Sequence, residues 1–229
     1  MANTSGNTPT EIYLAPADFI NSDHPLIIDF VEQHTSDRAT DLDNAISLYQ
    51  ATRDEIAYTP YWDFNDPETF RASNCPKTGK GMCQSKAAFL TAGARAAGIP
   101  ARIGFADVIN HMSSQKFLDL LGSNVFRWHA YTDLYLNGKW VKATPAFDAE
   151  LCKAFNVPPL EFDGLGDSLF QPNNSDDQKF MEYIKDRGTY ADLPHSEIIE
   201  DFKIHYAGAM TDNEELLEGS LQDDLEREK

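Results

Sequence analysis

The sequence predicts a single α+β domain, because helical patterns come first and strand patterns follow them. Residues 42–57 place apolar side chains at helical spacing, and residues 82–97 are rich in alanine and contain no proline. A strand pattern follows at 99–105, and two more flank the Asn-Gly pair at 137–138. We therefore expect helices packed on an antiparallel sheet, followed by a more variable helical end.

Three helices are expected in the first half of the chain. A short apolar helix covers residues 25–31, with Asp23 as its N-cap. The helix over 82–97 is followed by Gly98, the residue type that most often closes a helix in the left-handed conformation. Between them, the helix over 42–57 has one apolar face, formed by Ala45, Leu48, Tyr49, Thr52 and Ile56.

The strands are expected in the middle of the chain. The segment 99–105 contains an early proline and then alternates in the manner of a strand. Residues 127–136 and 139–143 are joined by Asn-Gly, which favours a two-residue hairpin turn. Pro145 lacks an N–H for the ladder and should end the last of these strands.

The remaining segments have weaker patterns. Residues 58–75 mix aromatic side chains with Pro, Asn and Asp, which predicts an irregular, packed connection. Residues 156–178 are typical of a loop, and two shorter helices are expected at 180–186 and 196–206.

Composition excludes several classes of partner. The chain has 229 residues, with 37 Asp and Glu against 19 Lys and Arg, and a formal charge of −18. Phosphate backbones are bound mainly through Lys and Arg, so no nucleic acid is expected as a partner. No stretch approaches the ~18 apolar residues that cross a bilayer, so no membrane is expected either. Since no secretory signal is visible, we expect a cytoplasmic location with Cys75, Cys83 and Cys152 as free thiols.

The chemistry that the sequence suggests centres on Cys83, in the opening turn of the 82–97 helix. A helix N-terminus stabilises an anion such as a thiolate by roughly 0.3–1 kcal/mol, and its free N–H groups can hold an oxyanion. His129, in the strand 127–136, would take the thiol proton and return it to a leaving group. Spacing alone also allows Cys83 to be a small core residue.

Several motifs occur in order around these two residues. Gly79-Lys80-Gly81-Met82-Cys83-Gln84 begins the helix, and the helix runs into Ala94-Arg95-Ala96-Ala97-Gly98-Ile99-Pro100-Ala101-Arg102. Trp128-His129-Ala130-Tyr131 and Gly138-Lys139-Trp140-Val141 follow. Together these motifs resemble the core of the transglutaminase-like superfamily over about residues 40–148.

The resemblance implies a papain-like fold, in which a cysteine-bearing helix packs on an antiparallel sheet that carries a histidine. It implies Cys83 as the nucleophile and His129 as general base and acid. The implied activity is acyl transfer at amide or peptide bonds through a thioester, as in a cysteine protease, an amidase or a transamidase. The implied partner is a peptide, a protein or a small amide, with no cofactor; the oligomeric state stays open.

One position departs from the family pattern. The third catalytic residue of the family is usually an aspartate just after the Trp-containing strand, and Thr144 stands there instead. Thr144 can orient His129 through its hydroxyl, or Asp148 can reach back from the following loop. Alternatively the site has lost activity, and the fold serves as a peptide- or protein-binding module.

Other candidates near this site have two interpretations each. Gln84 is either an oxyanion donor or an exposed first-turn residue, and Trp128 is either a wall of the site or a core aromatic. Arg102 is expected to form a structural ion pair. A zinc site is not expected, because Cys75, Cys83, His111 and His129 lack the usual ligand spacing.

The resemblance also sets the expected domain boundaries. We expect one transglutaminase-like domain over residues 1–210, with its first ten residues frayed. Residues 211–229 carry eight acidic and two basic side chains, which predicts an acidic tail that is a frayed helix or disordered.

Overall fold

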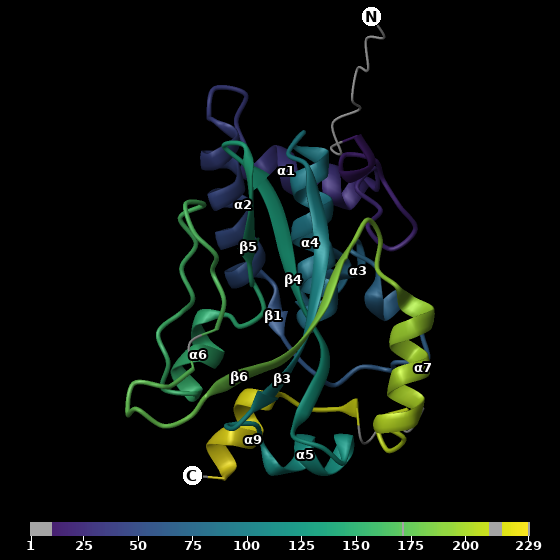
Figure 1. Ribbon diagram of the computed structural model, residues 1–229, viewed down its shortest axis with the longest axis vertical. Helices are drawn as coiled ribbons and strands as arrows, with labels where there is room; N and C mark the ends of the chain where they lie inside the picture. The colour runs from purple at the N-terminus through teal and green to yellow at the C-terminus, as the bar shows by residue number, and fades with distance from the viewer. Residues whose placement is uncertain (1–10, 171, 211–216, 229) are drawn as a thin grey trace, which may run out of the picture.

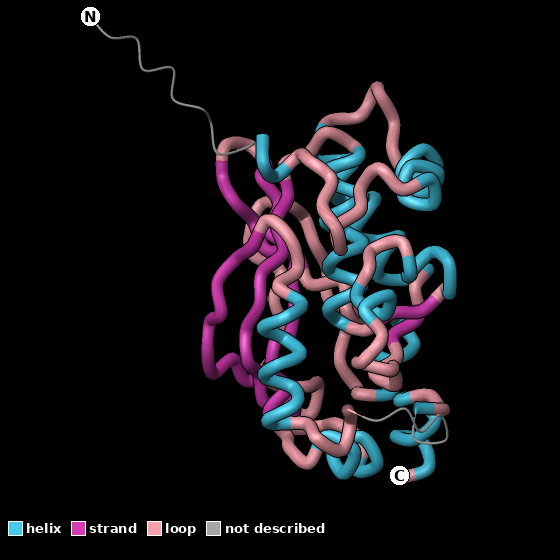
Figure 2. Tube along the Cα trace, turned by 90° about the vertical axis from the view of Figure 1, so that its right-hand side faces the viewer, coloured by secondary structure: helices cyan, strands magenta, loops and turns pink. Residues whose placement is uncertain are grey.

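The computed structural model describes residues 11–170, 172–210 and 217–228. Its main sheet is antiparallel with strand order β5-β4-β3-β6, and helices form a second layer beside it (Figures 1 and 2). The predicted α+β fold with a cysteine-bearing helix packed on an antiparallel sheet is confirmed. The strands of this sheet are β3 (Ala101–Asn110), β4 (Val125–Leu136), β5 (Lys139–Ala143) and β6 (Met181–Tyr190).

The helix that carries the cysteine is α4 (Cys83–Ala96), and it lies directly against β4. Its residues from Gln84 to Arg95 are all buried, because α4 also packs on α1 (Pro25–His34) and α2 (Asp41–Glu55). Thr132 on β4 donates a hydrogen bond to the Ala87 carbonyl of α4 at 2.8 Å. The alanine-rich sequence therefore allows a close helix–sheet approach that fixes the position of the helix start.

The N-caps of the first two helices differ in part from expectation. His24, and not Asp23, caps α1, since its Nδ1 accepts a hydrogen bond from the Leu26 N–H at 3.2 Å. Helix α2 begins one residue earlier than predicted and has a capping box formed by Thr40 and Asp43. This box satisfies two N–H groups at the helix start, which explains the earlier beginning.

The hairpin between β4 and β5 forms as predicted. Leu136 pairs with Lys139, and the two residues between them have positive φ angles, 51° at Asn137 and 82° at Gly138. Two positive φ angles in a two-residue turn match the right-handed twist of the paired strands.

The helix predicted at 180–186 is wrong, because this segment belongs to strand β6. Strand β6 pairs with β3, from Ile103 with Tyr190 to Asn110 with Met181. It supplies hydrogen-bond partners along the second edge of β3. The pattern within residues 180–186 gives no information about this distant edge.

The expected short helix at 196–206 is present as α7 (His195–His205). The connection 58–75 is largely irregular, as predicted. Further short elements have no clear sequence pattern: η1 (Glu11–Tyr13), β1 (Ala57–Tyr58), η2 (Pro67–Phe70), α3 (Asn74–Thr78), β2 (Lys80–Gly81), α5 (Gln115–Leu121) and α6 (Ala149–Ala154).

The C-terminal region contains a packed helix, α9 (Leu221–Arg227), where a frayed or disordered end was expected. Leu221 is buried, and the buried Asp224 accepts a hydrogen bond from the Tyr61 hydroxyl, which holds α9 against the domain. The expected frayed start at residues 1–10, and residues 211–216 and 229 of the expected tail, lie outside the described residues. No helix in the described ranges is long and apolar enough to cross a membrane.

Candidate active site around Cys83

Cys83 is the first residue of α4, and Met82 is the N-cap. The side chain is half-buried and lines a pocket together with Gln84 and His129. Burial raises the pKa of the Cys83 thiol to about 11, while the nearby backbone amides of Ala130, Gln84 and Cys83 itself act in the opposite direction. The helix start and β4 therefore meet at this sulfur.

Gln84 connects the cysteine to the sheet. The Cys83 thiol donates a hydrogen bond to Oε1 of Gln84 at 3.0 Å, and Nε2 of Gln84 donates to the Trp128 carbonyl at 3.0 Å. Gln84 is buried, so its position differs from that of an exposed first-turn residue. Its amide group holds the thiol proton in this state and is bonded to β4 rather than open to an oxyanion.

His129 lies in β4, in an aromatic environment. Its ring centroid is 5.4 Å from that of Phe170 and 6.4 Å from that of Tyr183. Burial lowers the pKa of His129 to about 4, and Nε2 has no hydrogen-bond partner among the described residues. Near neutral pH the pair is thus a neutral thiol and a neutral imidazole.

Thr144 and Asp148 have different environments. Thr144 directly follows β5 and is buried, and its Oγ1 has no hydrogen-bond partner in the described part of the chain. Asp148 is the N-cap of α6 and accepts hydrogen bonds from the N–H groups of Leu151 and Tyr58, both at 2.9 Å. Both carboxylate oxygens of Asp148 are therefore engaged by the backbone, whereas the Thr144 hydroxyl is free to orient another group.

The Trp128 side chain packs in the core and is not part of the pocket lining. Its ring contacts Phe105 at a centroid distance of 5.4 Å, and its indole N–H donates to Asp201 at 2.9 Å. The backbone of Trp128 nevertheless belongs to the site, because its carbonyl binds Gln84.

The pocket is mostly apolar and narrow, with a cavity volume of about 40 Å³. This volume holds only a few water molecules. Among the residues that line the pocket, Arg127 carries the positive charge. Aromatic side chains from five separate segments complete it: Tyr58, Phe64, Phe117, Phe126, Phe202 and Tyr206.

Sequence reasoning missed Tyr183 on β6, whose ring centroid lies 6.4 Å from that of His129. Burial raises the pKa of Tyr183, and its hydroxyl accepts a hydrogen bond from the Phe170 N–H at 3.4 Å. No local pattern could have identified Tyr183, because β6 itself was expected to be a helix.

The four residues considered for zinc do not gather in one place. Cys75 is fully buried beneath the start of α4, and His111 lies beside Glu182 at 3.4 Å. Over the described ranges, no group of three or more His, Cys, Asp or Glu side chains is arranged to hold a metal ion.

A helix that begins at a cysteine and packs on an antiparallel sheet carrying a histidine is the arrangement of the papain-like class of fold. The family model of the transglutaminase-like superfamily matches residues 28–145, just over half of the chain. The chain belongs to this superfamily.

Comparison with solved structures finds a proposed cysteine protease from Cytophaga hutchinsonii, with 16% sequence identity and a TM-score of 0.46. The match covers 61% of this chain and 42% of that chain. A search of the curated proteins finds no match.

Proposed function

We propose that the protein catalyses acyl transfer at amide or peptide bonds through a thioester on Cys83. The observation that carries this proposal is the position of the sulfur at the start of α4, beside the amide of Ala130 and in one pocket with His129. Backbone amides at a helix start stabilise both a thiolate and the oxyanion of a tetrahedral intermediate.

In the first half-reaction, the Cys83 sulfur attacks the amide carbonyl carbon while the thiol proton moves to His129. Nε2 of His129 is suited to receive it, because no other group binds this atom among the described residues. The intermediate collapses when the C–N bond breaks, and His129 protonates the leaving amine. The products are a free amine and a thioester on Cys83.

In the second half-reaction, water or a second amine attacks the thioester. His129 accepts a proton from the attacking group, and the departing sulfur takes that proton back as a thiol. Water as acceptor gives hydrolysis, and an amine gives transamidation. Substrates are peptides, proteins or small amides, and the reaction needs a reduced thiol, which fits a cytoplasmic location.

The resting state described above is not yet arranged for attack. The thiol donates to Gln84 rather than to His129, and burial opposes charge on both members of the pair. Substrate binding must therefore turn the Cys83 thiol away from Gln84, so that the sulfur gives its proton to the His129 imidazole as the carbonyl enters.

Iodoacetamide tests the accessibility of the proposed nucleophile. At pH 8 we expect Cys83 to be alkylated at least about tenfold faster than Cys75 or Cys152, which are almost fully buried. Since the pKa of Cys83 is about 11, its rate should rise about tenfold per pH unit between pH 7 and pH 9. Peptide mapping by mass spectrometry gives the rate for each cysteine.

Urea-denatured protein is the control for this measurement, because all three thiols should then react at similar rates. Equal and slow labelling of the three cysteines in the folded protein would contradict the proposal. Turnover of a peptide anilide by the wild type, with and without a primary amine, then separates hydrolysis from transamidation, and the Cys83→Ser variant should lose both activities.

A peptide- or protein-binding module is the second candidate function. It is favoured by Thr144, which leaves His129 without a carboxylate partner, and by the neutral state of the cysteine–histidine pair. A carboxylate partner normally supports the imidazolium that forms during attack.

A further inference from the structure

Strand β4 has a bulge directly before His129. Ala106 pairs with His129 and Val108 pairs with Phe126, so β4 has one residue more than β3 in this interval. Trp128, inside the bulge, has a φ of 57°, in the left-handed region. A bulky residue in this region is strained and persists only where surrounding groups hold it.

A closed network of charged groups holds Trp128. Asp107 on β3 accepts the backbone N–H of Trp128 at 3.1 Å and pairs with Arg187 on β6 through contacts of 2.6 and 2.8 Å. Arg187 also pairs with Asp201 on α7 at 2.8 Å, and Asp201 accepts the indole N–H of Trp128 at 2.9 Å.

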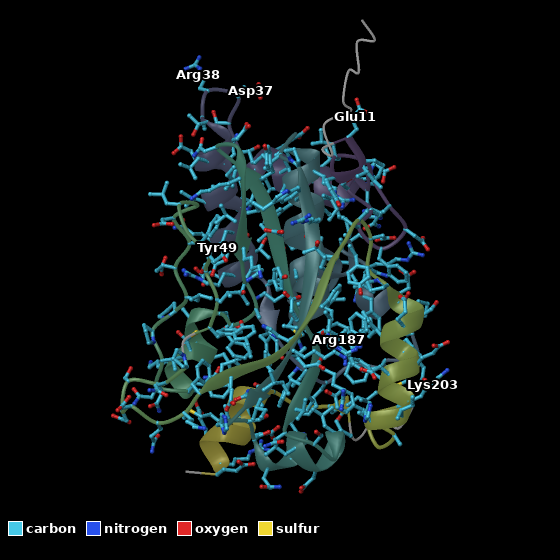
Figure 3. The ribbon with its side chains drawn as sticks, viewed as in Figure 1. Glu11, Asp37, Arg38, Tyr49, Arg187 and Lys203 are labelled. Atoms are coloured by element: carbon cyan, nitrogen blue, oxygen red, sulfur yellow. The ribbon has the colours of Figure 1, made fainter. Side chains whose placement is uncertain are left out.

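Arg187 closes this network over the tryptophan ring. Its guanidinium lies 4.4 Å from the Trp128 ring centroid, and Figure 3 labels Arg187 on β6 near the centre of the view. Asp107 is 2% exposed, and the Arg187 side chain is 10% exposed. The network thus fixes both the backbone and the side chain of one strained residue.

The backbone carbonyl of Trp128 connects this network to the candidate active site. The Trp128 carbonyl accepts from Gln84, Gln84 accepts from the Cys83 thiol, and His129 is the next residue in the chain. A rotation of this backbone would therefore move His129 and release Gln84 at the same time.

Resting on the function proposed above, we propose that Asp107, Arg187 and Asp201 are positioning residues of the active site. They hold Trp128 in the left-handed conformation, and through it they set the place of His129 and Gln84 relative to the Cys83 sulfur. None of the three lines the pocket, so their effect passes through Trp128 and through Arg127 of the lining, whose guanidinium lies 3.8 Å from the Asp107 carboxylate.

The chain offers a matched control at the other end of the same two strands. Asp133 on β4 is 3% exposed and pairs with Arg102 on β3 at 2.7 Å. The Arg102 guanidinium lies 4.0 Å from the Trp140 ring centroid. This aspartate–arginine–tryptophan cluster has a similar composition and burial, but it has no bond to a residue of the site.

The test compares Asp107→Asn with Asp133→Asn in the full-length protein. The titration of His129, followed by NMR, is expected to shift upward from a pKa of about 4 by about one unit or more in Asp107→Asn, because loss of the bulge geometry exposes the ring. In Asp133→Asn the His129 pKa should stay unchanged. Cys83, Tyr183 and Arg127, which surround His129, are retained in both variants.

Alkylation of Cys83 across pH gives a second readout. The pH profile of the rate should change in Asp107→Asn and match the wild type in Asp133→Asn, even where the two variants lose similar thermal stability. Asp201→Asn, which removes a more exposed carboxylate, should change both readouts in the same direction by a smaller amount. It also carries the test if Asp107→Asn does not fold.

Two results would overturn the proposal and show that the network is only structural. One is an equal shift of the His129 pKa in Asp107→Asn and Asp133→Asn. The other is no shift of this pKa in either Asp107→Asn or Asp201→Asn. Failure of the proposed function would show in a different measurement, the alkylation of the wild-type protein. If Cys83 reacts no faster than Cys75 in the wild type, acyl transfer is excluded, while the His129 titration still reports whether the network positions the strand.

Discussion

Replacing Lys86 with methionine is expected to remove about 3 kcal/mol of pH dependence from the free energy of unfolding. Lys86 lies on α4 one turn after Cys83 and is fully buried. Its ammonium donates hydrogen bonds to the carbonyls of Arg53 and Ile56, at the C-terminal end of α2. Burial lowers its pKa from 10.5 to about 8.

The sign of the effect follows from proton binding. Between pH 8 and pH 10.5 the unfolded chain keeps the proton on Lys86 and the folded protein releases it, so stability from this group rises with pH. Below pH 8 both states are protonated, and the cost of the buried charge is constant. The Lys86→Met variant has no such group and should lack this rise.

Urea denaturation of both proteins from pH 7 to pH 10.5 measures this difference. Subtracting the two curves cancels the contributions of titrating groups that do not interact with Lys86. Lys80→Met is the matched control, because Lys80 is exposed and lies on the neighbouring strand β2. Parallel curves for wild type and Lys86→Met would contradict a buried ammonium.

Replacing Thr144 with aspartate is expected to increase turnover by about a hundredfold or more, because loss of the acid from a catalytic triad costs about 10⁴-fold. Thr144 directly follows β5 and is buried, and its hydroxyl has no hydrogen-bond partner among the described residues. A carboxylate there can pair with the imidazolium. It should raise the pKa of His129 from about 4 and favour transfer of the Cys83 proton.

Turnover of a peptide anilide and the alkylation rate of Cys83 both measure this effect. Thr144→Asn is the matched control, since it has nearly the same shape as the aspartate and no charge. Asp148→Asn tests the alternative third residue, and it should leave the His129 titration unchanged because Asp148 binds backbone N–H groups. An inert Cys83 in Thr144→Asp would favour the binding module instead.

The parts of the fold that the sequence predicted depend on local chemistry. Alanine-rich composition identified α4, and the Asn137-Gly138 pair identified the β4–β5 turn, because these signals lie within the elements themselves. Strand β6 depends instead on the open edge of β3, about 80 residues away in the sequence, so a short apolar segment was mistaken for a helix.

The residues of the candidate site also fall into those that local motifs indicate and those that only the tertiary structure brings together. Cys83 and His129 could be named as candidates from the sequence because their motifs are short and ordered along the chain. The bulge at Trp128 and the network of Asp107, Arg187 and Asp201 could not be found, since each contact joins a different pair of elements. Asp148 was a reasonable third residue by distance along the chain, and only the structure shows that it caps α6.

The narrowness of the pocket beside Cys83 has a practical consequence for ligand discovery. Because the cavity beside Cys83 has a volume of only about 40 Å³, the first compounds screened against it should be small. Compact electrophiles that carry a single small apolar group are the reasonable starting compounds. Adding larger groups to these compounds stepwise would then show how far the aromatic side chains of the pocket can move.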